Sequence, residues 1–282
     1  MYKRQALNNY VALHFASRHM SWLHCMWGVG ASIGPYIMEY ALTGGRGWNA
    51  GYRYIAILQF ALTAILLLSL PLWKQRAGTE SAAEDAGKPL SLREIARIPG
   101  ARAVMAAFFC YCALEQTTGL WASSYLALRW GLSAQEAASH ASLFFVGITA
   151  GRALSGFLTL KFSDTQMIRL GQAVLLAGVL CLLLPFGTSS ALTGLVLVGL
   201  GCAPVYPSII HSTPDRFGAD QSQAIIGIQM ASAYVGTCLM PPLFGLIANH
   251  ISVSLLPPYL LVLLAMMALM HERLLKATGK KA

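Results

Sequence analysis

The chain has 282 residues, of which 56% are hydrophobic and only 11% are charged. Soluble domains carry about 25% charged residues, so this deficit indicates a protein whose solvent is lipid. The net charge of +9 does not indicate a nucleic-acid-binding protein, because the lysines and arginines lie at the ends of apolar segments and in short loops. Apolar stretches of about 20–30 residues recur along the chain, as in proteins with several membrane-spanning helices.

The start of the chain differs in character from the segments after it. Residues 1–5 fit poorly with residues 6–15, which read as the end of a helix, so we expect a truncated chain with a non-native head. Eight membrane-spanning helices are predicted after residue 15, which makes this an all-α membrane protein. The predicted spans are residues 20–40, 51–73, 101–129, 136–160, 167–187, 189–212, 221–249 and 251–271.

The basic residues predict which side of the membrane each loop faces. If the helix that begins near Met20 runs outward, all of the 20 lysines and arginines except Arg46, Arg53 and Arg129 lie on the cytoplasmic side. Positively charged loops stay in the cytoplasm, so we expect both chain ends there. The membrane would be an inner membrane of the bacterial type.

Residues 74–100 form the one long loop of this pattern, and its small, polar middle predicts a flexible linker. Ser91 and Glu94 fit a capping box for a short amphipathic helix on the membrane surface, and an ordinary lead-in turn fits as well. Two six-helix halves joined by a cytoplasmic loop are a common transporter plan. The expected parts are a remnant of the N-terminal half with the end of helix 4 and helices 5 and 6 (1–73), the linker (74–100) and a C-terminal six-helix half (101–282).

The segment 103–128 holds the strongest functional candidate, because it places Glu115 near the middle of a membrane span. An ionisable group at that depth is costly and normally faces a bundle interior or a watery cavity. Glu115 can carry a proton or accept hydrogen bonds from a sugar, and the structural alternative is an acceptor satisfied by a neighbouring helix. Gln116 and Trp121 also suit a sugar. They lie about 100° and about 240° round the helix from Glu115, so we do not expect all three to line one cavity, and Trp121 also fits a membrane interface.

Glycines and prolines mark further stretches. Residues 27–35 (W-G-V-G-A-S-I-G-P) contain glycines four residues apart, a spacing that lets two helices approach closely. Residues 201–207 contain two prolines that we expect to break the helix and expose carbonyl groups, as is tolerated where the backbone lines a cavity. Pro241 and Pro242 are expected to break the helix of the next span in the same way.

A charged motif lies at a cytoplasmic helix end. Gly151 and Arg152 are followed by Gly156, which allows close packing, and by Asp164 after a short loop. Arg152 and Asp164 can pair across this loop, or cap the next helix through its dipole. Such a pair would be a cytoplasmic gate that breaks when the halves of the protein move. Charges that only set the topology explain the same pattern.

Taken in order, these stretches resemble the major facilitator superfamily, and most closely its fucose-permease-like sugar transporters. The resemblance rests on G-x3-G-P after Leu23-His24, an acidic residue with a tryptophan in the seventh helix, and G-R-x3-G in the eighth. It also rests on A-P-x-[FY]-P followed by R-F-G in the tenth. It implies a twelve-helix bundle with pseudo-symmetric halves, of which about eight helices are present here. It also implies proton-coupled uptake by alternating access.

Other polar or aromatic groups at span depth are candidates for substrate binding or proton coupling, and helix-packing hydrogen bonds explain each as well. They are Asn8, His24, Trp27, Tyr206, Gln229 and Tyr234. The six cysteines all fall in apolar segments and read as small buried residues, so we expect no metal and no cofactor. The expected partners of a monomeric chain are the lipid bilayer, protons and a small solute, with a hexose as the leading candidate.

The leading prediction is therefore a secondary transporter of a small hydroxylated solute. An exporter of amphipathic compounds is the alternative, and its site would be mostly apolar. We do not expect an enzyme, because the sequence has no H-E-x-x-H motif and no cluster of histidines with carboxylates. A sensor would need a sizeable soluble domain, and a channel would need a repeated filter sequence. An inactive transporter fragment also fits the sequence.

Overall fold

The structure is a computed structural model that describes residues 2–77 and 92–279. Over these residues every regular element is a helix, so the predicted all-α membrane fold is confirmed. The chain divides into two compact units. The first unit comprises Met1–Gly28 and Leu90–Ala282, and the second comprises Val29–Pro89.

Eight long helices in the described residues correspond to the eight predicted spans. They are α2 (Ser17–Thr43), α3 (Gly47–Ala77), α5 (Ala101–Trp130), α6 (Ala134–Leu158), α7 (Asp164–Leu183), α8 (Thr188–His211), α10 (Ala219–His250) and α11 (Leu256–Ala277). Four short elements lie between or before them. These are α1 (Tyr2–His14), α4 (Leu92–Ile95), α9 (Thr213–Phe217) and the 3₁₀ turn η1 (Val253–Leu255).

Six of the long helices are long and apolar enough to cross a membrane, namely α3, α6, α7, α8, α10 and α11. The other two, α2 and α5, have the length but carry more polar residues. In α5 the polar run includes Thr117 and Thr118, which are buried inside the unit. Polar groups that point into a bundle lower the hydropathy of a helix without exposing polar atoms to lipid. Both helices therefore remain candidates for membrane spans.

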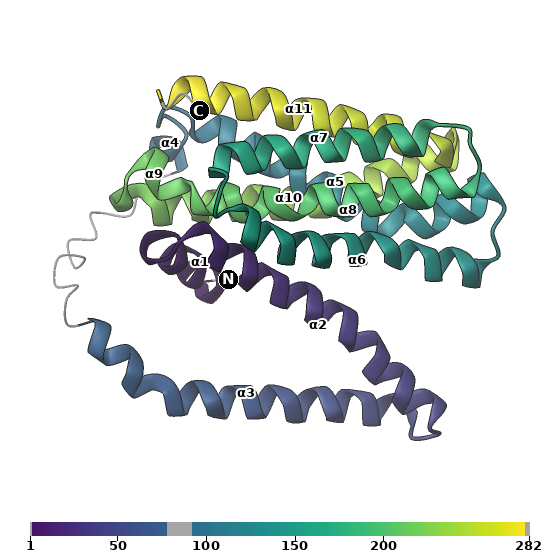
Figure 1. Cartoon of the computed structure of the whole chain (residues 1–282), viewed down its shortest axis with the longest axis horizontal. Helices are drawn as coiled ribbons and strands as arrows, with labels where there is room; N and C mark the ends of the chain where they lie inside the picture. The colour runs from purple at the N-terminus through teal and green to yellow at the C-terminus, as the bar shows by residue number, and fades with distance from the viewer. Residues whose placement is uncertain (1, 78–91, 280–282) are drawn as a thin grey trace. The chain divides into compact units, whose positions relative to one another are not determined.

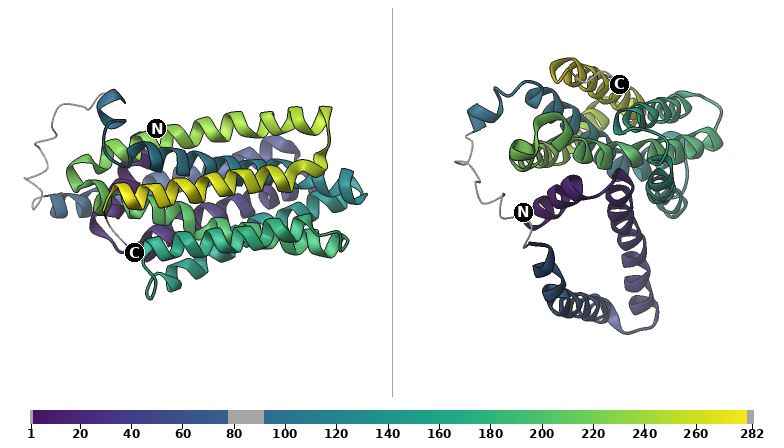
Figure 2. Two further views of the ribbon diagram at one scale, coloured as in Figure 1. Left: turned by 90° about the horizontal axis from the view of Figure 1, so that it is seen from above. Right: turned by 60° about the vertical axis from the view of Figure 1, so that its left-hand side comes forward.

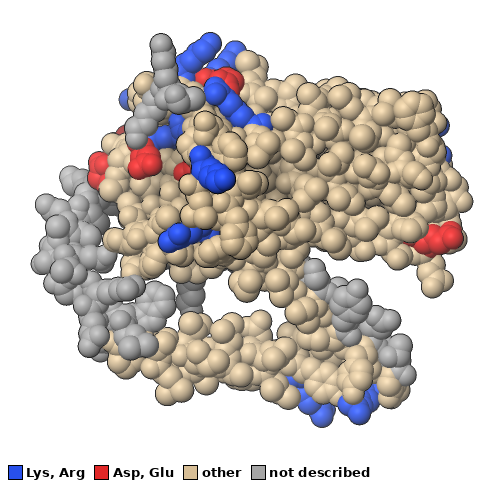
Figure 3. Space-filling view, in the orientation of Figure 1, with Lys and Arg blue, Asp and Glu red and all other residues tan. Residues whose placement is uncertain are grey.

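In the first unit, α5, α6, α7, α8, α10 and α11 run side by side (Figures 1 and 2). Helix α8 packs against both α6 and α7, while α5 packs against α10 and α11. Charged side chains on the visible face gather where α11 ends, and the flanks of the helices are nearly free of charge (Figure 3). Arg273 and Lys276 are exposed in the last turns of α11. This pattern is typical of an apolar belt bordered by a charged membrane interface.

Small residues set the close approach of α8 to its neighbours. A Cβ atom added to Gly178 of α7 would lie 2.6 Å from the backbone nitrogen of Val198 in α8. A Cβ atom added to Gly147 of α6 would lie 2.5 Å from the carbonyl oxygen of Val196, which also belongs to α8. Neither site has room for a side chain, so glycine determines how near these helices come, as is common between membrane helices.

The prolines do not break their helices, contrary to the prediction. Pro204 and Pro207 lie inside a continuous α8, and Pro241 and Pro242 lie inside a continuous α10. A proline removes one backbone N–H and can bend a helix, but packing by neighbouring helices can hold the helix together. Here α7 packs closely against α8 at Pro204, since a Cβ atom added to Gly171 of α7 would lie 2.9 Å from the Pro204 ring.

The last helix begins at Leu256, later than the predicted residue 251. Pro257 lies in its first turn, where a missing N–H costs nothing because that group has no partner within the helix. The residues before it form η1, and the hydroxyl of Ser252 accepts a hydrogen bond of 3.1 Å from the N–H of Ser254.

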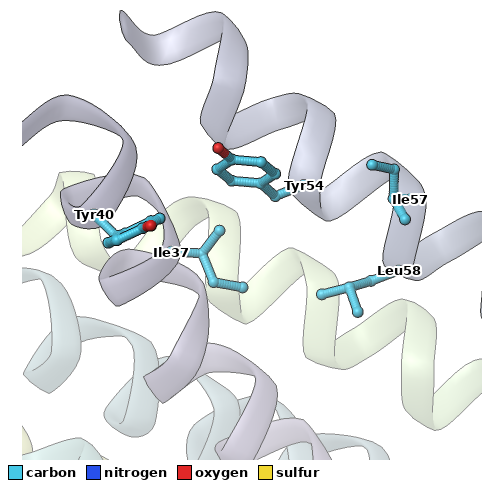
Figure 4. A pocket seen from close by; sticks show the side chains of 5 residues that line it. All are labelled: Ile37, Tyr40, Tyr54, Ile57 and Leu58. Carbon is cyan, nitrogen blue, oxygen red and sulfur yellow. The ribbon is translucent and has the colours of Figure 1, made fainter. Parts of the chain in front are cut away.

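The second unit contains the end of α2, the turn after it and α3. Residues of the two helices border a pocket of about 430 Å³, and Figure 4 shows its lining side chains Ile37, Tyr40, Tyr54, Ile57 and Leu58. The guanidinium of Arg46 donates a hydrogen bond of 2.7 Å to the hydroxyl of Tyr54. Apart from its two tyrosines the pocket lining is aliphatic, and no residue of the predicted site belongs to it.

Much of the predicted linker, including Ser91 of the predicted capping box, lies outside the described residues. The helix α4 covers only four residues, and Ile95 at its end is buried in the apolar core of the first unit. The division of the chain at residues 73 and 100 stays a prediction.

Candidate functional site

Glu115 on α5 and Arg152 on α6 form an ion pair within the first unit. The Nη2 atom of Arg152 lies 3.4 Å from Oε1 of Glu115, and the two side chains are 4% and 17% exposed. A buried charge is strongly unfavourable unless it is paired. The two residues are 37 positions apart in the sequence, on neighbouring helices that both contribute to the core.

Helix α2 provides two further contacts to Arg152. Its Nη1 atom donates a hydrogen bond of 3.2 Å to the backbone carbonyl of His24, and its guanidinium lies 4.9 Å from the ring centre of Trp27. The second contact is a cation–π interaction. Helix α2 comes this near because Gly28 has no side chain: a Cβ atom there would lie 2.5 Å from the hydroxyl of Thr149 on α6.

Aromatic rings link α2 to α5 and α8. The His24 ring lies 4.6 Å from the ring of Tyr206, which in turn lies 4.8 Å from Phe108 and 6.1 Å from Tyr111. The hydroxyl of Tyr111 donates a hydrogen bond of 3.0 Å to the carbonyl of Cys202. Tyr111 is therefore fixed by the α8 backbone, and it holds one side of the aromatic group in place.

The charged–aromatic cluster, as we name it, consists of Glu115, Arg152, His24, Trp27 and Tyr206. The structure thus brings together five residues that the sequence singled out separately. Trp27 is 44% exposed, so the cluster reaches the surface of the described chain. It offers a carboxylate, a guanidinium, an indole face and a phenol. These groups can bind the hydroxyl groups and the apolar face of a small polar solute.

Trp121 lies apart from this cluster, as the helical angles predicted. Its Nε1 atom donates a hydrogen bond of 3.1 Å to the carbonyl of Pro241, and its ring packs 5.2 Å from that of Phe244. Both partners belong to α10. Trp121 also lines a groove of about 310 Å³ between α5 and α10. Gln116, the next candidate on α5, is half-buried.

The remaining candidates have different environments. Gln229 is completely buried, and its Nε2 atom donates a hydrogen bond of 3.1 Å to the hydroxyl of Thr213 at the start of α9. This is a hydrogen bond of helix packing, the alternative that the sequence left open. Asn8 is buried in α1, and Tyr234 is exposed on α10.

Arg152 pairs with Glu115 and not with Asp164, so the predicted pair across the loop is wrong, and Asp164 takes the alternative role at the start of the next helix. Side chains in a helix tilt towards its N-terminus, which carries Arg152 away from the loop and into the bundle. Asp164 instead begins α7 after the capping residue Ser163, where a carboxylate is favourable for the helix dipole.

Asp164 belongs to a second polar cluster, here named the α7–α8 end cluster, with Ser17, His211 and the carbonyl of Phe15. Its two oxygens lie 2.6 Å from the hydroxyl of Ser17 and 2.6 Å from Nδ1 of His211. The Nε2 atom of His211 lies 2.9 Å from the carbonyl oxygen of Phe15. A neutral imidazole has one N–H group, so both histidine bonds form only when His211 is charged.

Arg216 of α9 lies close to this second cluster. Its Nη2 atom donates a hydrogen bond of 2.8 Å to the hydroxyl of Thr165, next to Asp164. Burial lowers the pKa of Arg216, and the nearby carboxylates of Asp164 and Asp215 oppose this effect. Because the guanidinium of arginine stays protonated at neutral pH, Arg216 places a positive charge near Asp164.

The two glycines of the predicted gate both lie at tight helix contacts. A Cβ atom on Gly151 would lie 2.6 Å from that of Ala203 on α8, and one on Gly156 would overlap the indole of Trp22 on α2. They bring α6 close to two different helices. In residues 2–77 and 92–279, no group of three or more histidines, cysteines or carboxylates could hold a metal ion.

Sequence reasoning did not find the Glu115–Arg152 pair or the partners of Asp164. The available signal for the first was the presence of opposite charges in consecutive apolar segments, because two such charges lower their cost by meeting. For the second there was little signal, since Ser17 and His211 are ordinary residues for helix ends.

Comparison with known proteins agrees with this fold. The family model described as Major Facilitator Superfamily matches residues 104–280. A Saccharomyces cerevisiae relative named Bypass of stop codon protein 6 is 23% identical over 288 residues, which cover 89% of this chain and 56% of the relative. The chain thus spans little more than half the length of that relative.

Solved structures with the same fold include the transporter FucP in the outward conformation. That structure has a TM-score of 0.75 at 16% identity, over 95% of this chain and 71% of the other. A variant of the E. coli fucose:proton symporter FucP gives 0.74 at 17% identity, over 95% and 72%. The peptide transporter POT in complex with alafosfalin gives 0.55 at 18% identity, over 65% and 40%. Since the family model covers more than half of the chain, and the helices adopt the fold of these transporters, the chain belongs to the major facilitator superfamily.

Proposed function

We propose that this protein is a secondary transporter that moves a small hydroxylated solute of the sugar class across the cytoplasmic membrane, together with protons, by alternating access. The observation that carries the proposal is the Glu115–Arg152 ion pair, which lies inside the helical bundle among aromatic side chains. Charges at such depth are costly and mark solute or proton pathways by default. One of the similar structures is named a fucose:proton symporter, which makes this solute class and coupling ion the first to test.

In the proposed mechanism Glu115 carries the proton. Its carboxylate holds Arg152 at 3.4 Å in the unprotonated state, and protonation weakens this attraction. His24, Trp27 and Tyr206 contact the solute, with the Trp27 indole against an apolar face of a sugar ring. Asn8, Gln116 and Tyr234 are proposed as further polar groups along the pathway. Trp121 and Gln229 take a packing role in this scheme, since their polar atoms bond to α10 and α9.

The α7–α8 end cluster takes the role of the cytoplasmic gate in this proposal. Three hydrogen bonds join Phe15, in the turn before α2, and Ser17, the first residue of α2, to the start of α7 and the end of α8. Opening on that side would have to separate these groups. Gly151 and Gly156 act by keeping α6 close to its neighbours, and both chain ends lie in the cytoplasm of a monomeric protein.

The test is solute-driven proton movement in liposomes that contain the purified chain and a pH-sensitive dye. Addition of a transported hexose should acidify the lumen, and a panel of hexoses identifies the preferred one. Glu115→Gln should abolish proton-driven accumulation of labelled solute and spare exchange of labelled for unlabelled solute. Glu272→Gln is the matched control, because Glu272 is an ion-paired carboxylate that is 46% exposed on α11. Unchanged accumulation by Glu115→Gln would exclude Glu115 as the proton carrier.

Export of amphipathic compounds is the second candidate function. The observation that favours it is the largely aliphatic pocket of about 430 Å³ in the second unit. In the same liposomes, proton-driven movement of an amphipathic dye with no response to any hexose would support export over sugar uptake.

A further inference from the structure

Among the described residues of the first unit, two arginine–glutamate pairs use the same edge of the guanidinium group in different ways. At the exposed pair, Nε and Nη2 of Arg169 donate to the two oxygens of Glu272 at 2.9 Å and 3.0 Å. This two-bond arrangement is the one in which arginine recognises a carboxylate most specifically. At the buried pair, only Nη2 of Arg152 reaches Glu115, at 3.4 Å.

The rest of that Arg152 edge is unused. Its Nε–H group is buried and has no hydrogen-bond partner among the described residues. Nη1 donates to the His24 carbonyl, Trp27 lies against the guanidinium, and the Tyr111 hydroxyl also interacts with Arg152, so these further contacts are to neutral groups. Glu115 therefore supplies the whole counter-charge of Arg152 through a single long contact. The edge could accept a better-placed carboxylate.

Protonation of Glu115 changes the charge of this site. The pair is neutral when Glu115 is ionised, and it carries one positive charge when Glu115 is protonated. A neutral sugar would leave that charge without a partner on a side chain that is 4% exposed, which is unfavourable in a low-dielectric interior. A solute that brings its own carboxylate would restore neutrality and would occupy both Nε and Nη2.

We infer that the charged–aromatic cluster binds a hydroxylated carboxylate, such as a sugar acid, through the Nε and Nη2 edge of Arg152, with Glu115 protonated as the solute enters. This inference rests on the proposed function and names its solute class. The solute carboxylate replaces the Glu115 carboxylate, and the proton remains on Glu115. Trp27 and Tyr206 contact the hydroxylated part of the solute.

Other titratable groups face this site and contribute to any pH dependence of binding. They are Tyr111 and Cys112 on α5, Cys202 and Tyr206 on α8, Tyr234 on α10 and His24 on α2. Variants at Glu115 are therefore needed to assign a pH effect to its carboxylate. His24→Gln serves as the control for the histidine.

The experiment compares D-gluconate with D-gluconamide, which have the same hydroxyl groups and differ in charge. Equilibrium binding of each labelled compound to the purified chain is measured in detergent between pH 5.5 and pH 7.5, where the carboxylate of gluconate remains ionised. If binding of gluconate is coupled to uptake of one proton by Glu115, each decrease of one pH unit should increase the gluconate affinity by up to about tenfold. This holds over the pH range in which Glu115 is ionised in the free protein. Gluconamide should bind at least tenfold more weakly at the acidic end.

Two variants test the assignment to Glu115 and Arg152. Glu115→Gln mimics the protonated carboxyl group and should lose the part of the pH dependence that Glu115 causes, which is the part that His24→Gln retains. Its affinity for gluconate should be no lower than that of the unmodified chain at pH 5.5. Arg152→Lys keeps the charge but lacks the two-bond edge and should lose at least tenfold in gluconate affinity. The gluconate–gluconamide comparison uses the unmodified chain, so it does not depend on the folding of either variant.

The outcomes separate this inference from the proposed function. Equal binding of gluconate and gluconamide, or binding of D-glucose without gluconate, would overturn the carboxylate inference and leave a hydroxylated-solute transporter standing. No binding of any of the three, together with no solute-driven proton movement in liposomes, would overturn both. Gluconate binding without pH dependence in the unmodified chain would refute the exchange of carboxylates at Arg152.

Discussion

Removal of one member of the Glu115–Arg152 pair should destabilise the protein more than removal of both. The change Glu115→Leu leaves Arg152 with no counter-charge on a side chain that is 4% exposed. Loss of one partner from a buried pair costs about 3–5 kcal/mol. Glu115 is 17% exposed and its contact with Arg152 is long at 3.4 Å, so we expect the lower end of that range, about 3 kcal/mol.

The double variant Glu115→Leu/Arg152→Met should recover most of this loss, because an apolar pair of similar volume can replace a buried ion pair at little cost. The expected coupling free energy between the two positions is therefore at least about 2–3 kcal/mol, the part of the Glu115→Leu loss that the double variant recovers, plus whatever Arg152→Met costs alone. The assay is equilibrium unfolding in detergent for the unmodified chain, both single variants and the double variant.

The exposed pair Arg169–Glu272 provides the matched control. Its two hydrogen bonds are shorter, at 2.9 Å and 3.0 Å, yet its side chains are 44% and 46% exposed. Solvent screening should keep the coupling of this pair below about 1 kcal/mol. A coupling at Glu115–Arg152 that is no larger than at Arg169–Glu272 would refute the reasoning, since burial would then not govern the strength of either pair.

Three further predictions concern packing and pH. Gly178→Ala should destabilise the protein by about 1–3 kcal/mol in detergent unfolding, because its Cβ atom would lie 2.6 Å from the α8 backbone. Gly30→Ala is the control: its Cβ atom meets no described atom within 4 Å, so this change should be neutral or stabilising. Trp121→Phe loses the hydrogen bond to Pro241 and should cost about 0.5–1.5 kcal/mol while leaving solute binding unchanged; weaker binding would place Trp121 in the site. Raising the pH until His211 is neutral should weaken its contacts with Asp164 and Phe15. Amide hydrogen exchange around Ser17, after correction for the intrinsic exchange rates, should then become faster. His211→Gln should remove this pH dependence, and equal exchange rates at both pH values in the unmodified chain would contradict a charged His211.

The long helices were predictable because apolar runs of about 20 residues in lipid have few alternatives to a helix. The effects of proline were less predictable. The predicted span 251–271 placed Pro257 well inside a helix, whereas the structure places it in the first turn. Pro204 and Pro207 were expected to break α8, but the helix persists, because its stability depends on packing against α6 and α7 that is not visible in one segment of sequence.

The candidate site was predictable residue by residue but not as an assembly. The depth of Glu115 followed from its position in the segment, and the angle between Glu115 and Trp121 followed from helix geometry. The partner of Glu115 did not follow, because Arg152 read as a residue at a helix end. Its position depends on the direction of a long side chain and on the approach of α2 at Gly28, both of which are tertiary properties.

The two arginine–glutamate pairs are arranged in the opposite way from what stability alone would favour. A pair buried in a low-dielectric interior gains most from complete hydrogen bonding, whereas an exposed pair gains little from it. In this protein the exposed pair has both bonds, and the buried pair has one long contact with an unused Nε–H group. Local rules of stability are most often broken at functional sites. The incomplete pair is therefore better explained by a site that must exchange one carboxylate for another than by a structural brace between α5 and α6.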